Sequence, residues 1–367
     1  MNYVLALARR DLLVYFRDRS NVFFSLMGVL VVVMLYLLFL RDMLLESYPD
    51  MYGMDHLMDA WVLSGILAIV PVTTCAGSLQ NMVEDRASGR EKDMLVAPLT
   101  GSGIAAAHIL STFAVGLTMS IIALFLCLAY LMATGCPVTI SGAAGCVLLT
   151  VPSSLSASVI LFAVTSFIRS TGAFSGLFVT LSVLIGFLTG IYMPMGSMPD
   201  GMNIVGTLLP ASQMAALFRD SLACEALGQS FSGLPPEALT DFRCDMGFDL
   251  SLGGLEFSTA TSVAYVLAAS VLFFAIAAMR VMKRRCRRNR LISDSGLRGH
   301  GQIRPRMLRH GRHPHPRPQL MAMGARMLRR GQRTQLPRLR QRGDRRARVH
   351  AQGHRPLDLE EPGGHHL

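Results

Sequence analysis

The sequence lacks the motifs on which nucleotide-hydrolysing and other hydrolytic enzymes depend. It contains no phosphate loop of the GxxxxGK(S/T) form, no HExxH zinc motif and no GxSxG nucleophile turn. Its 7 cysteines show no spacing typical of a metal site. We therefore predict no catalytic residue and no metal site, and we expect a chain that is not an enzyme and binds no cofactor itself.

Charged residues are almost absent from the long apolar runs, and His108 is the only ionisable residue near one of them. Carriers driven by a proton or sodium gradient usually keep an acidic side chain or unwound carbonyls at mid-membrane. If this chain moves a solute uphill, the energy must therefore come from another polypeptide. The alternative is an ATPase-independent secondary transporter or channel, which predicts an inverted repeat that the sequence does not show.

Hydrophobic residues make up 51% of the 367 residues, and they are concentrated in six apolar stretches. A hydrocarbon core about 30 Å thick requires about 20 helical residues to cross it. The predicted spans are residues 22–40, 60–79, 109–133, 143–168, 171–193 and 258–279. The predicted fold class is an all-α, multi-pass integral membrane protein with six transmembrane helices.

The basic residues between these spans predict the orientation. Arginine and lysine gather before the first span, in the loop over residues 80–108, at Arg169 and over residues 280–290, whereas the alternate loops are acidic or uncharged. Because basic loops stay on the cytoplasmic side, we expect both termini in the cytoplasm and the chain in the plasma (cell inner) membrane. The first apolar run is too long for a cleavable signal peptide, which we do not expect.

The two ends of the chain differ in character. Residues 1–21 carry apolar side chains at helical spacing, with Arg9 and Arg10 between them. We expect an amphipathic helix in the membrane interface with its arginines toward anionic headgroups, although a plain cytoplasmic extension would also fit. Residues 22–290 then form the membrane domain, and residues 291–367 form a basic tail.

The tail has no lysine and no aromatic residue from residue 299 onwards. It cannot bury enough apolar surface to offset its ordering entropy, so we predict disorder. Its Arg, Pro, Gly, His and Gln content is typical of a GC-rich gene read out of frame, which is the interpretation we favour. Binding of nucleic acid or anionic lipid is the alternative, and we expect no specific nucleic-acid partner.

Prolines and small residues interrupt several spans. Pro71 lies in the second span, and Pro152 precedes a serine-rich stretch in the fourth. Such residues indicate kinks and close helix packing, with a substrate path as the alternative. Glycines spaced four apart in the fifth span favour close helix approach, within the chain or across a dimer interface. They are Gly172, Gly176, Gly186 and Gly190.

The segment over residues 194–257 is the longest connection and is expected outside the cell. Its first part has prolines separated by apolar runs too short to cross the membrane, which predicts broken, re-entrant helices at the outer leaflet. The remainder predicts a small polar cap. An oxidising exterior would permit a disulfide between Cys224 and Cys244, with Cys136 as a competing partner.

The loop after the second span is dense in charge and then returns to apolar sequence. Residues 83–98 read VEDRASGREKDMLVAP, and they predict a short charged helix that Gly89 breaks or tightens. A charged cytoplasmic helix anchored between two spans is a suitable contact for a soluble partner. A merely solvated loop is the alternative.

Over about residues 1–290 this layout resembles the membrane subunit of an ABC-2 type ABC transporter, the type V exporter fold. The family loop after span two shows an acidic residue, a glycine, an apolar turn and a proline. The corresponding positions here are Glu84, Gly89, Leu95 and Pro98. The family also closes span five with Gly-x-x-x-Pro, followed by Leu-Pro and an arginine. The matching residues are Gly190, Pro194, Leu209, Pro210 and Arg219.

The resemblance implies a permease that pairs with a second permease half, as a homo- or heterodimer, and with cytosolic ABC ATPase subunits that hydrolyse the ATP. The N-terminal helix and the loop after span two would contact the ATPase. The implied partner-coupling residues are Glu84, Asp85, Gly89, Arg90, Leu95 and Pro98. The apolar spans favour export of a hydrophobic or amphipathic solute, such as a drug, a peptide or a lipid-like molecule. The long outer segment and the basic tail depart from the family pattern.

Overall fold

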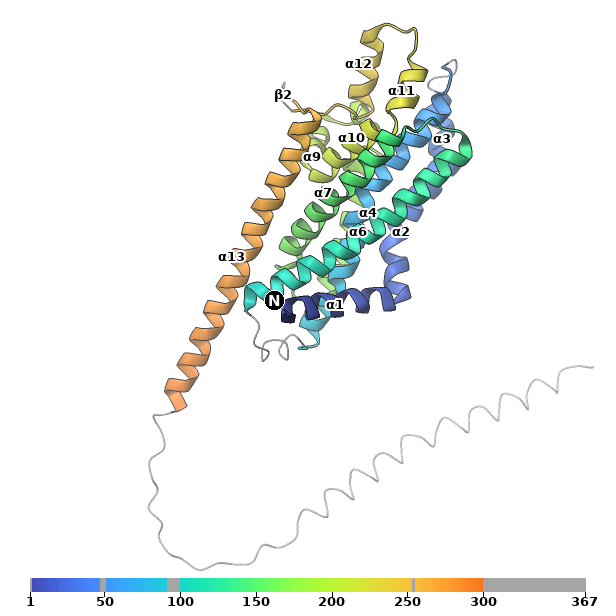
Figure 1. Ribbon diagram of the computed structural model, residues 1–367. Helices are drawn as coiled ribbons and strands as arrows, with labels where there is room; N and C mark the ends of the chain where they lie inside the picture. The colour runs from blue at the N-terminus through green and yellow to red at the C-terminus, as the bar shows by residue number, and fades with distance from the viewer. Residues whose placement is uncertain (1, 47–50, 91–99, 253–254, 300–367) are drawn as a thin grey trace, which may run out of the picture. The chain divides into compact units, whose positions relative to one another are not determined.

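The computed structural model describes residues 2–46, 51–90, 100–252 and 255–299. These lie in one compact unit, residues 1–300. Figure 1 shows its long helices side by side in a bundle, with a shorter helix across one end and two short helices at the other. The regular structure of the described residues is helical except for one short pair of strands.

Among the described residues, six helices are long and apolar enough to cross a membrane. The first runs continuously through α2 (Arg19–Leu35), the π-helix η1 (Tyr36–Leu40) and α3 (Arg41–Glu46). The other five are α4 (Met54–Ala87), α6 (Gly101–Thr134), α7 (Ile140–Thr165), α8 (Thr171–Leu188) and α13 (Thr259–Gly299). Each contains most of one predicted span, so the six-span, all-α membrane fold is confirmed.

Several predicted boundaries differ from the structure; α4 and α6, for example, begin at Met54 and Gly101, six and eight residues before the predicted spans. The fifth span ends at Leu188 rather than at residue 193, because Gly190 adopts a left-handed conformation with φ of 76° that a continuing helix does not allow. α13 continues to Gly299, past residue 290, where the sequence predicts the end of the membrane domain. Residues 300–367 of the predicted tail lie outside the described residues.

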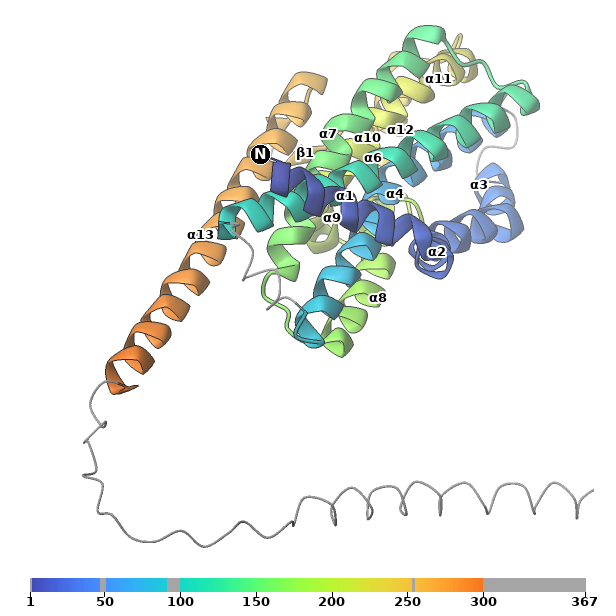
Figure 2. The ribbon, with the colours of Figure 1, turned by 60° about the horizontal axis from the view of Figure 1, so that its bottom comes forward.

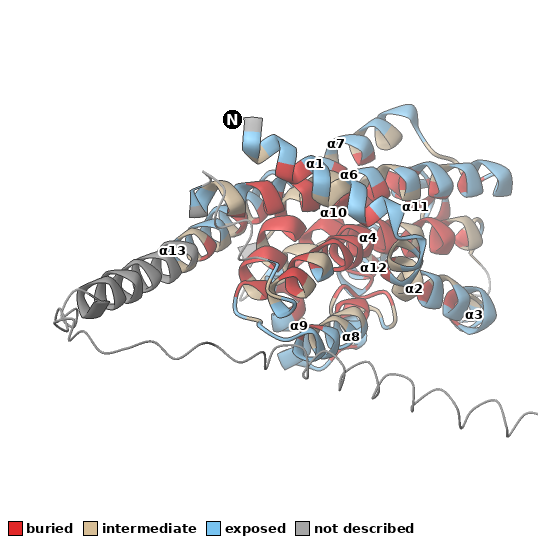
Figure 3. Cartoon of the chain, turned by 90° about the horizontal axis from the view of Figure 1, so that it is seen from below, coloured by how far each residue is buried: buried red, intermediate tan, exposed pale blue. Residues whose placement is uncertain are grey.

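The centre of the bundle is α4. Its most apolar window is 94% buried, against 17% for the first and fifth spanning helices. It contacts α2, α6, α7, α8 and α10 (Pro210–Leu222), and Figure 3 shows buried residues gathered around α4 and α10. The other spanning helices expose apolar side chains such as Phe24, Leu148 and Val271. Lipid tails solvate such side chains as well as a protein interior does.

Short polar side chains fix the starts of several spanning helices. The Thr100 hydroxyl accepts a hydrogen bond from the Gly103 N–H at 3.1 Å before α6, and the Ser170 hydroxyl accepts one from the Ala173 N–H at 3.2 Å before α8. These N-caps satisfy N–H groups that have no partner within the helix. The starts of α6, α7 and α8 thus lie at a Ser or Thr next to an apolar run.

The prolines and serines inside the spans take part in packing. Pro71 lies within the buried part of α4 and Pro152 within α7. The hydroxyl of Ser154 in α7 is buried 3.4 Å from that of Ser120 in α6, and Ser156 donates to a carbonyl of its own helix. These hydroxyl groups are used inside the protein, which agrees with the packing interpretation.

Between α8 and α13 the chain forms a compact segment of short helices and one strand pair. It consists of the 3-10 turn η2 (Met195–Ser197), α9 (Asp200–Leu208), α10, α11 (Cys224–Ser230), α12 (Pro236–Asp245), β1 (Ser251–Leu252) and its antiparallel partner β2 (Leu255–Glu256). α9 ends and α10 begins at Leu209 and Pro210, where the proline occupies the first helical position. α10 then packs on α4, α7 and α13. The predicted broken helices are present, and their re-entrant location in the outer leaflet stays a prediction.

Gly142 is a position where a larger residue should destabilise the fold. It lies in the first turn of α7, where an added Cβ would collide with the backbone carbonyl oxygen of Ser221 in α10. A backbone oxygen cannot rotate away as a side chain can, so we expect Gly142→Ala to lower the free energy of unfolding by about 2 kcal/mol.

Gly145, three residues further along α7, provides the matched control. An added Cβ there would lie 3.4 Å from the Ser221 hydroxyl oxygen, which is close to ordinary contact. Thermal unfolding in detergent should therefore give a lower melting temperature for Gly142→Ala than for Gly145→Ala. Equal melting temperatures would contradict the close packing of α7 on α10.

Candidate partner-coupling site

α1 (Asn2–Arg17) is packed against the end of the bundle opposite to α11 and α12, and Figure 2 shows it crossing α6 and α4. Leu7 and Ala8 are buried against Ala107 of α6. Tyr15 is fully buried, and its hydroxyl lies 2.7 Å from the hydroxyl of Ser25 in α2. These contacts hold α1 to three of the helices, while its location in the membrane interface stays a prediction.

A buried carboxylate in the last turn of α4 receives a side chain from α1. Asp85 is 7% exposed, and both terminal nitrogens of Arg10 lie 3.1 Å from its Oδ2. On the other side, Arg90 Nε lies 3.2 Å from Asp85 Oδ1. Hydrogen bonds between ionised groups are about twice as strong as neutral ones. Asp85 therefore connects α1 to the start of the charged loop.

A second polar contact ties α1 to α6. His108 Nδ1 lies 2.8 Å from Asp11 Oδ2, and both side chains are largely buried. Close by, Arg86 Nη1 of α4 donates to the carbonyl of Thr165 at the end of α7. The ends of α4, α6 and α7 are thus joined to one another and to α1 by polar contacts. We refer to this set as the coupling cluster, which consists of Arg10, Asp11, Asp85, Arg90 and His108.

The structure corrects the expected form of the charged loop. Glu84 and Asp85 are not on a separate short helix, because α4 continues to Ala87. Gly89 follows the C-cap residue with φ of 81° and ends the helix, as a left-handed glycine at this position commonly does. Glu84 is half-buried and accepts a hydrogen bond from Gln80 at 2.9 Å. Two predicted residues, Leu95 and Pro98, lie outside the described residues.

Three members of the coupling cluster are not among the site residues predicted from the sequence. Arg10 is expected to face lipid headgroups, whereas it turns to the buried carboxylate of Asp85. His108 is noted only as an ionisable residue near a span and Asp11 has no predicted role, yet the two side chains meet. An available signal was Asp11, which shares the helical spacing of Leu7, Ala8 and Tyr15 and so lies on an apolar face, where a carboxylate needs a partner.

The outer predicted residues gather around a buried arginine. Arg219 of α10 is 1% exposed, and its two terminal nitrogens donate to the carbonyls of Gly247 at 3.0 Å and Thr189 at 2.9 Å. The guanidinium carbon lies 4.8 Å from the ring centroid of Trp61 in α4, a cation–π contact. Burial lowers the pKa of Arg219 to about 9, which leaves the group charged at neutral pH.

The other outer residues of the family-like pattern shape the backbone around Arg219. An added Cβ on Gly190 would lie 3.6 Å from an Arg219 terminal nitrogen. Pro194 is the N-cap of the 3-10 turn, and Leu209 and Pro210 form the break before α10. The arginine thus fixes the turn after α8 and the loop after α12 to α10 and α4. This site is structural and lies at the opposite end of the bundle from the coupling cluster.

The predicted disulfide is not formed in this structure. Cys224 begins α11 and Cys244 lies in α12, both exposed, and Cys224 is a free thiol. The pairing stays a prediction for oxidising conditions. Cys136, the competing partner, is a buried thiol. Within the described ranges, no group of three His, Cys, Asp or Glu side chains could hold a metal ion.

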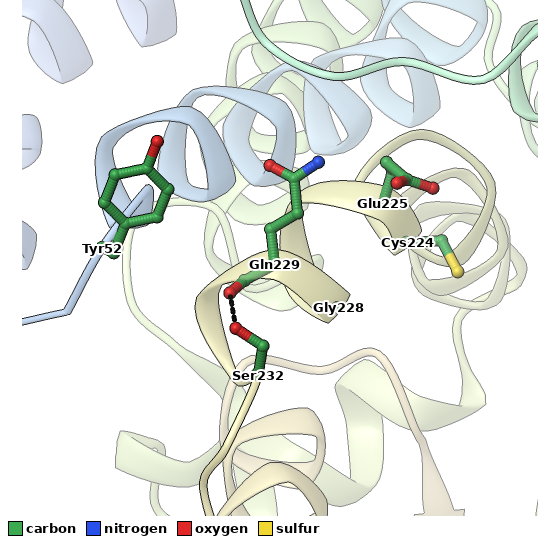
Figure 4. Close-up of a pocket in the computed structure, with 6 residues that line it drawn as sticks. All are labelled: Tyr52, Cys224, Glu225, Gly228, Gln229 and Ser232. Carbon is green, nitrogen blue, oxygen red and sulfur yellow. Dashed lines mark hydrogen bonds between the residues drawn. The ribbon is translucent and has the colours of Figure 1, made fainter.

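A cavity of about 410 Å³ lies beside α11 (Figure 4). Its lining combines polar and apolar surface, and the Ser232 hydroxyl donates to the backbone carbonyl of Gln229 at 2.8 Å. The residues around it are Tyr52, Cys224, Glu225, Gly228, Gln229 and Ser232. Such a lining, drawn mostly from one short helix, does not provide the apolar enclosure that a hydrophobic solute needs.

Comparison with known families assigns most of the sequence to one family. Residues 41–279 match a family model described as an ABC-2 family transporter protein. The matched region contains four of the six spanning helices in full (α4, α6, α7 and α8) and parts of the other two, together with Asp85, Arg90, His108 and Arg219. No curated protein matches the sequence.

Proposed function

Since this chain belongs to the ABC-2 transporter family as a membrane permease component, we propose that it forms the translocation path of an ATP-driven exporter. In this proposal the chain pairs with a second permease half, identical or different, and with cytosolic ABC ATPase subunits. The ATP is hydrolysed by those subunits, and this chain binds no nucleotide. Both termini are cytoplasmic, and the membrane is the plasma (cell inner) membrane.

The coupling cluster is the observation that carries this proposal. Arg10 and Asp85 join α1 to α4 at the same end of the bundle where Glu84 and Arg90 begin the charged loop. This end carries basic residues in the sequence, which favours the cytoplasmic side. A partner that pushes on α1 or on the loop would therefore move both, and with them the most buried helix of the bundle, α4.

The composition of the spans supports a hydrophobic or amphipathic cargo, such as a drug, a peptide or a lipid-like molecule. The buried hydroxyls of Thr150, Ser156 and Ser158 in α7 donate to carbonyls of their own helix. Their hydrogens are therefore not available as donors to a strongly polar solute. The spanning helices instead expose apolar side chains along their length, and these suit a solute that enters from the bilayer.

Charge reversal in the loop tests the partner assignment. Glu84 is half-buried and Arg90 exposed at the end of α4, so we expect the variant E84K/R90E to retain its place in the membrane and lose ATPase binding. The expected loss is about tenfold in the amount of ATPase that co-purifies, because a few charged contacts at a protein interface contribute about 1–3 kcal/mol.

Asp42 supplies the matched control for this experiment. It is exposed on α3, at the other end of the bundle, so Asp42→Lys should leave the co-purified ATPase unchanged. If E84K/R90E binds as much ATPase as the unmodified chain, the coupling assignment is wrong. If transport continues with no ATPase present, the ATPase-independent transporter is the correct function.

A further inference from the structure

A second buried carboxylate lies at the outer end of α4. Asp59 is 2% exposed and accepts a hydrogen bond from the Tyr36 hydroxyl at 2.5 Å. Arg41 Nε lies 3.2 Å from the same carboxylate oxygen, and the Tyr130 hydroxyl donates to the other oxygen at 3.4 Å. Two of the three donors belong to the first spanning helix and one to α6. The sequence analysis, which finds almost no charge within the spans, assigns this residue no role.

The local helix geometry explains how two donors of one helix reach the same carboxylate. Tyr36 begins the π-helix η1 and Arg41 follows it, and the Arg41 N–H donates to the Tyr36 carbonyl. In an α-helix, two residues five apart point about 140° away from each other, because each residue turns the helix by about 100°. A π-turn pairs residues five apart and brings them to one face. The π-helix therefore aims both Tyr36 and Arg41 at Asp59.

Apolar packing holds this helix only weakly. Its most apolar window is 17% buried, the lowest value among the spanning helices together with α8. Toward the outer end, Leu40 and Leu44 are buried in the same core as Tyr36. A buried charge that loses its partners is strongly destabilising. Separating the helix from α4 therefore requires new partners for Asp59, and the polar contacts decide whether the helix end stays attached.

We propose that Asp59, together with Tyr36, Arg41 and Tyr130, forms an outer latch that holds the first spanning helix closed on α4 and α6 and opens during transport. Asp59 and Asp85 lie on one continuous helix, about 40 Å apart at 1.5 Å per residue. A displacement of the coupling cluster along α4 would reach the latch through this helix. The opening during transport rests on the function proposed above, whereas the latch itself does not.

The accessibility of a thiol under the latch provides the test. Leu44 is 6% exposed on α3, so a Leu44→Cys reporter should react slowly with a membrane-impermeant maleimide applied to right-side-out vesicles. The reporter chain carries serine in place of Cys136, Cys224, Cys244 and Cys286, so that other accessible thiols do not react. We expect Asp59→Asn to raise the labelling rate of Cys at position 44 about tenfold, which corresponds to a loss of about 1.4 kcal/mol.

Graded variants separate the latch from general loss of structure. Tyr36→Phe removes only a short hydrogen bond and should also raise the rate, whereas Tyr130→Phe removes a long one and should change it less than about twofold. Cys75 is fully buried in α4 and should stay unlabelled in each variant. If labelling of Cys75 rises with Asp59→Asn, the protein has unfolded. The effect of Tyr36→Phe on the labelling rate at position 44 then tests the latch in its place.

Labelling during ATP hydrolysis by the assembled complex tests the opening step. A faster reaction with ATP than without nucleotide supports a latch that opens with each cycle. An effect of Asp59→Asn without any effect of ATP would keep the latch and overturn its link to the ATPase. Equal labelling rates for Asp59→Asn, Tyr36→Phe and the unmodified latch would overturn the proposal.

Discussion

Replacing Arg219 by methionine should lower the free energy of unfolding by about 3 kcal/mol. The substitution leaves the buried carbonyls of Thr189 and Gly247 without their donors, and an unsatisfied buried acceptor costs about 1–3 kcal/mol. It also removes the cation–π contact with Trp61. The methionine relieves the desolvation of one charge, which offsets part of this loss.

The control and the conservative variant sharpen this experiment. Arg169 is exposed in the turn between α7 and α8, so Arg169→Met should change the stability by less than about 0.5 kcal/mol. Arg219→Lys should fall in between, because a single ammonium group lacks the planar fork that reaches two carbonyls. Thermal unfolding of the three variants in detergent measures the order. A melting temperature for Arg219→Met equal to that of Arg169→Met would contradict the structural role of Arg219.

Reversing the charge of Asp85 should uncouple the transporter rather than unfold it. In Asp85→Arg, the new guanidinium faces Arg10 and Arg90, so α1 and the loop lose their common anchor. Arg10 is 42% exposed, and water can therefore solvate the released groups. We expect cargo-stimulated ATP hydrolysis by the complex to fall about tenfold, since coupling between sites is typically about 1–3 kcal/mol.

Exchanging the charges at positions 10 and 85 tests whether loss of the Arg10–Asp85 contact causes the loss of stimulated ATP hydrolysis. Arg10→Asp in the Asp85→Arg chain recreates an opposite pair and should recover part of the lost stimulation. Glu46→Arg, at an exposed position at the other end of the bundle, should leave the stimulation unchanged. If the double variant is no better than Asp85→Arg alone, the Arg10–Asp85 contact does not carry the coupling.

Hydropathy and charge predict the spanning helices well, because length and apolarity are imposed by the bilayer itself. α7 and α8 begin close to the predicted spans, after the caps Thr139 and Ser170. The extension of α4 to Ala87 was harder to predict. Its last turn contains charged residues that hydropathy assigns to a loop, and the partner that stabilises Asp85 is far away in the sequence.

The candidate site could be predicted only in part, for the same reason. The sequence pattern selects Glu84, Asp85 and Gly89, because they are local features of one loop. It does not distinguish the half-buried Glu84 from the buried Asp85, since the difference depends on where Arg10 packs. Asp59 was not predicted as a functional residue for a related reason, because two of its donors reach it only through a π-turn.

Co-purification of the full chain from native membranes tests the central claim most directly. The chain is solubilised in a mild detergent, and the proteins bound to it are identified and quantified by mass spectrometry. The account predicts an ABC ATPase in stoichiometric yield with the permease, and a loss of that ATPase in E84K/R90E but not in Asp42→Lys. A folded chain that transports its solute with no ATPase bound would contradict it.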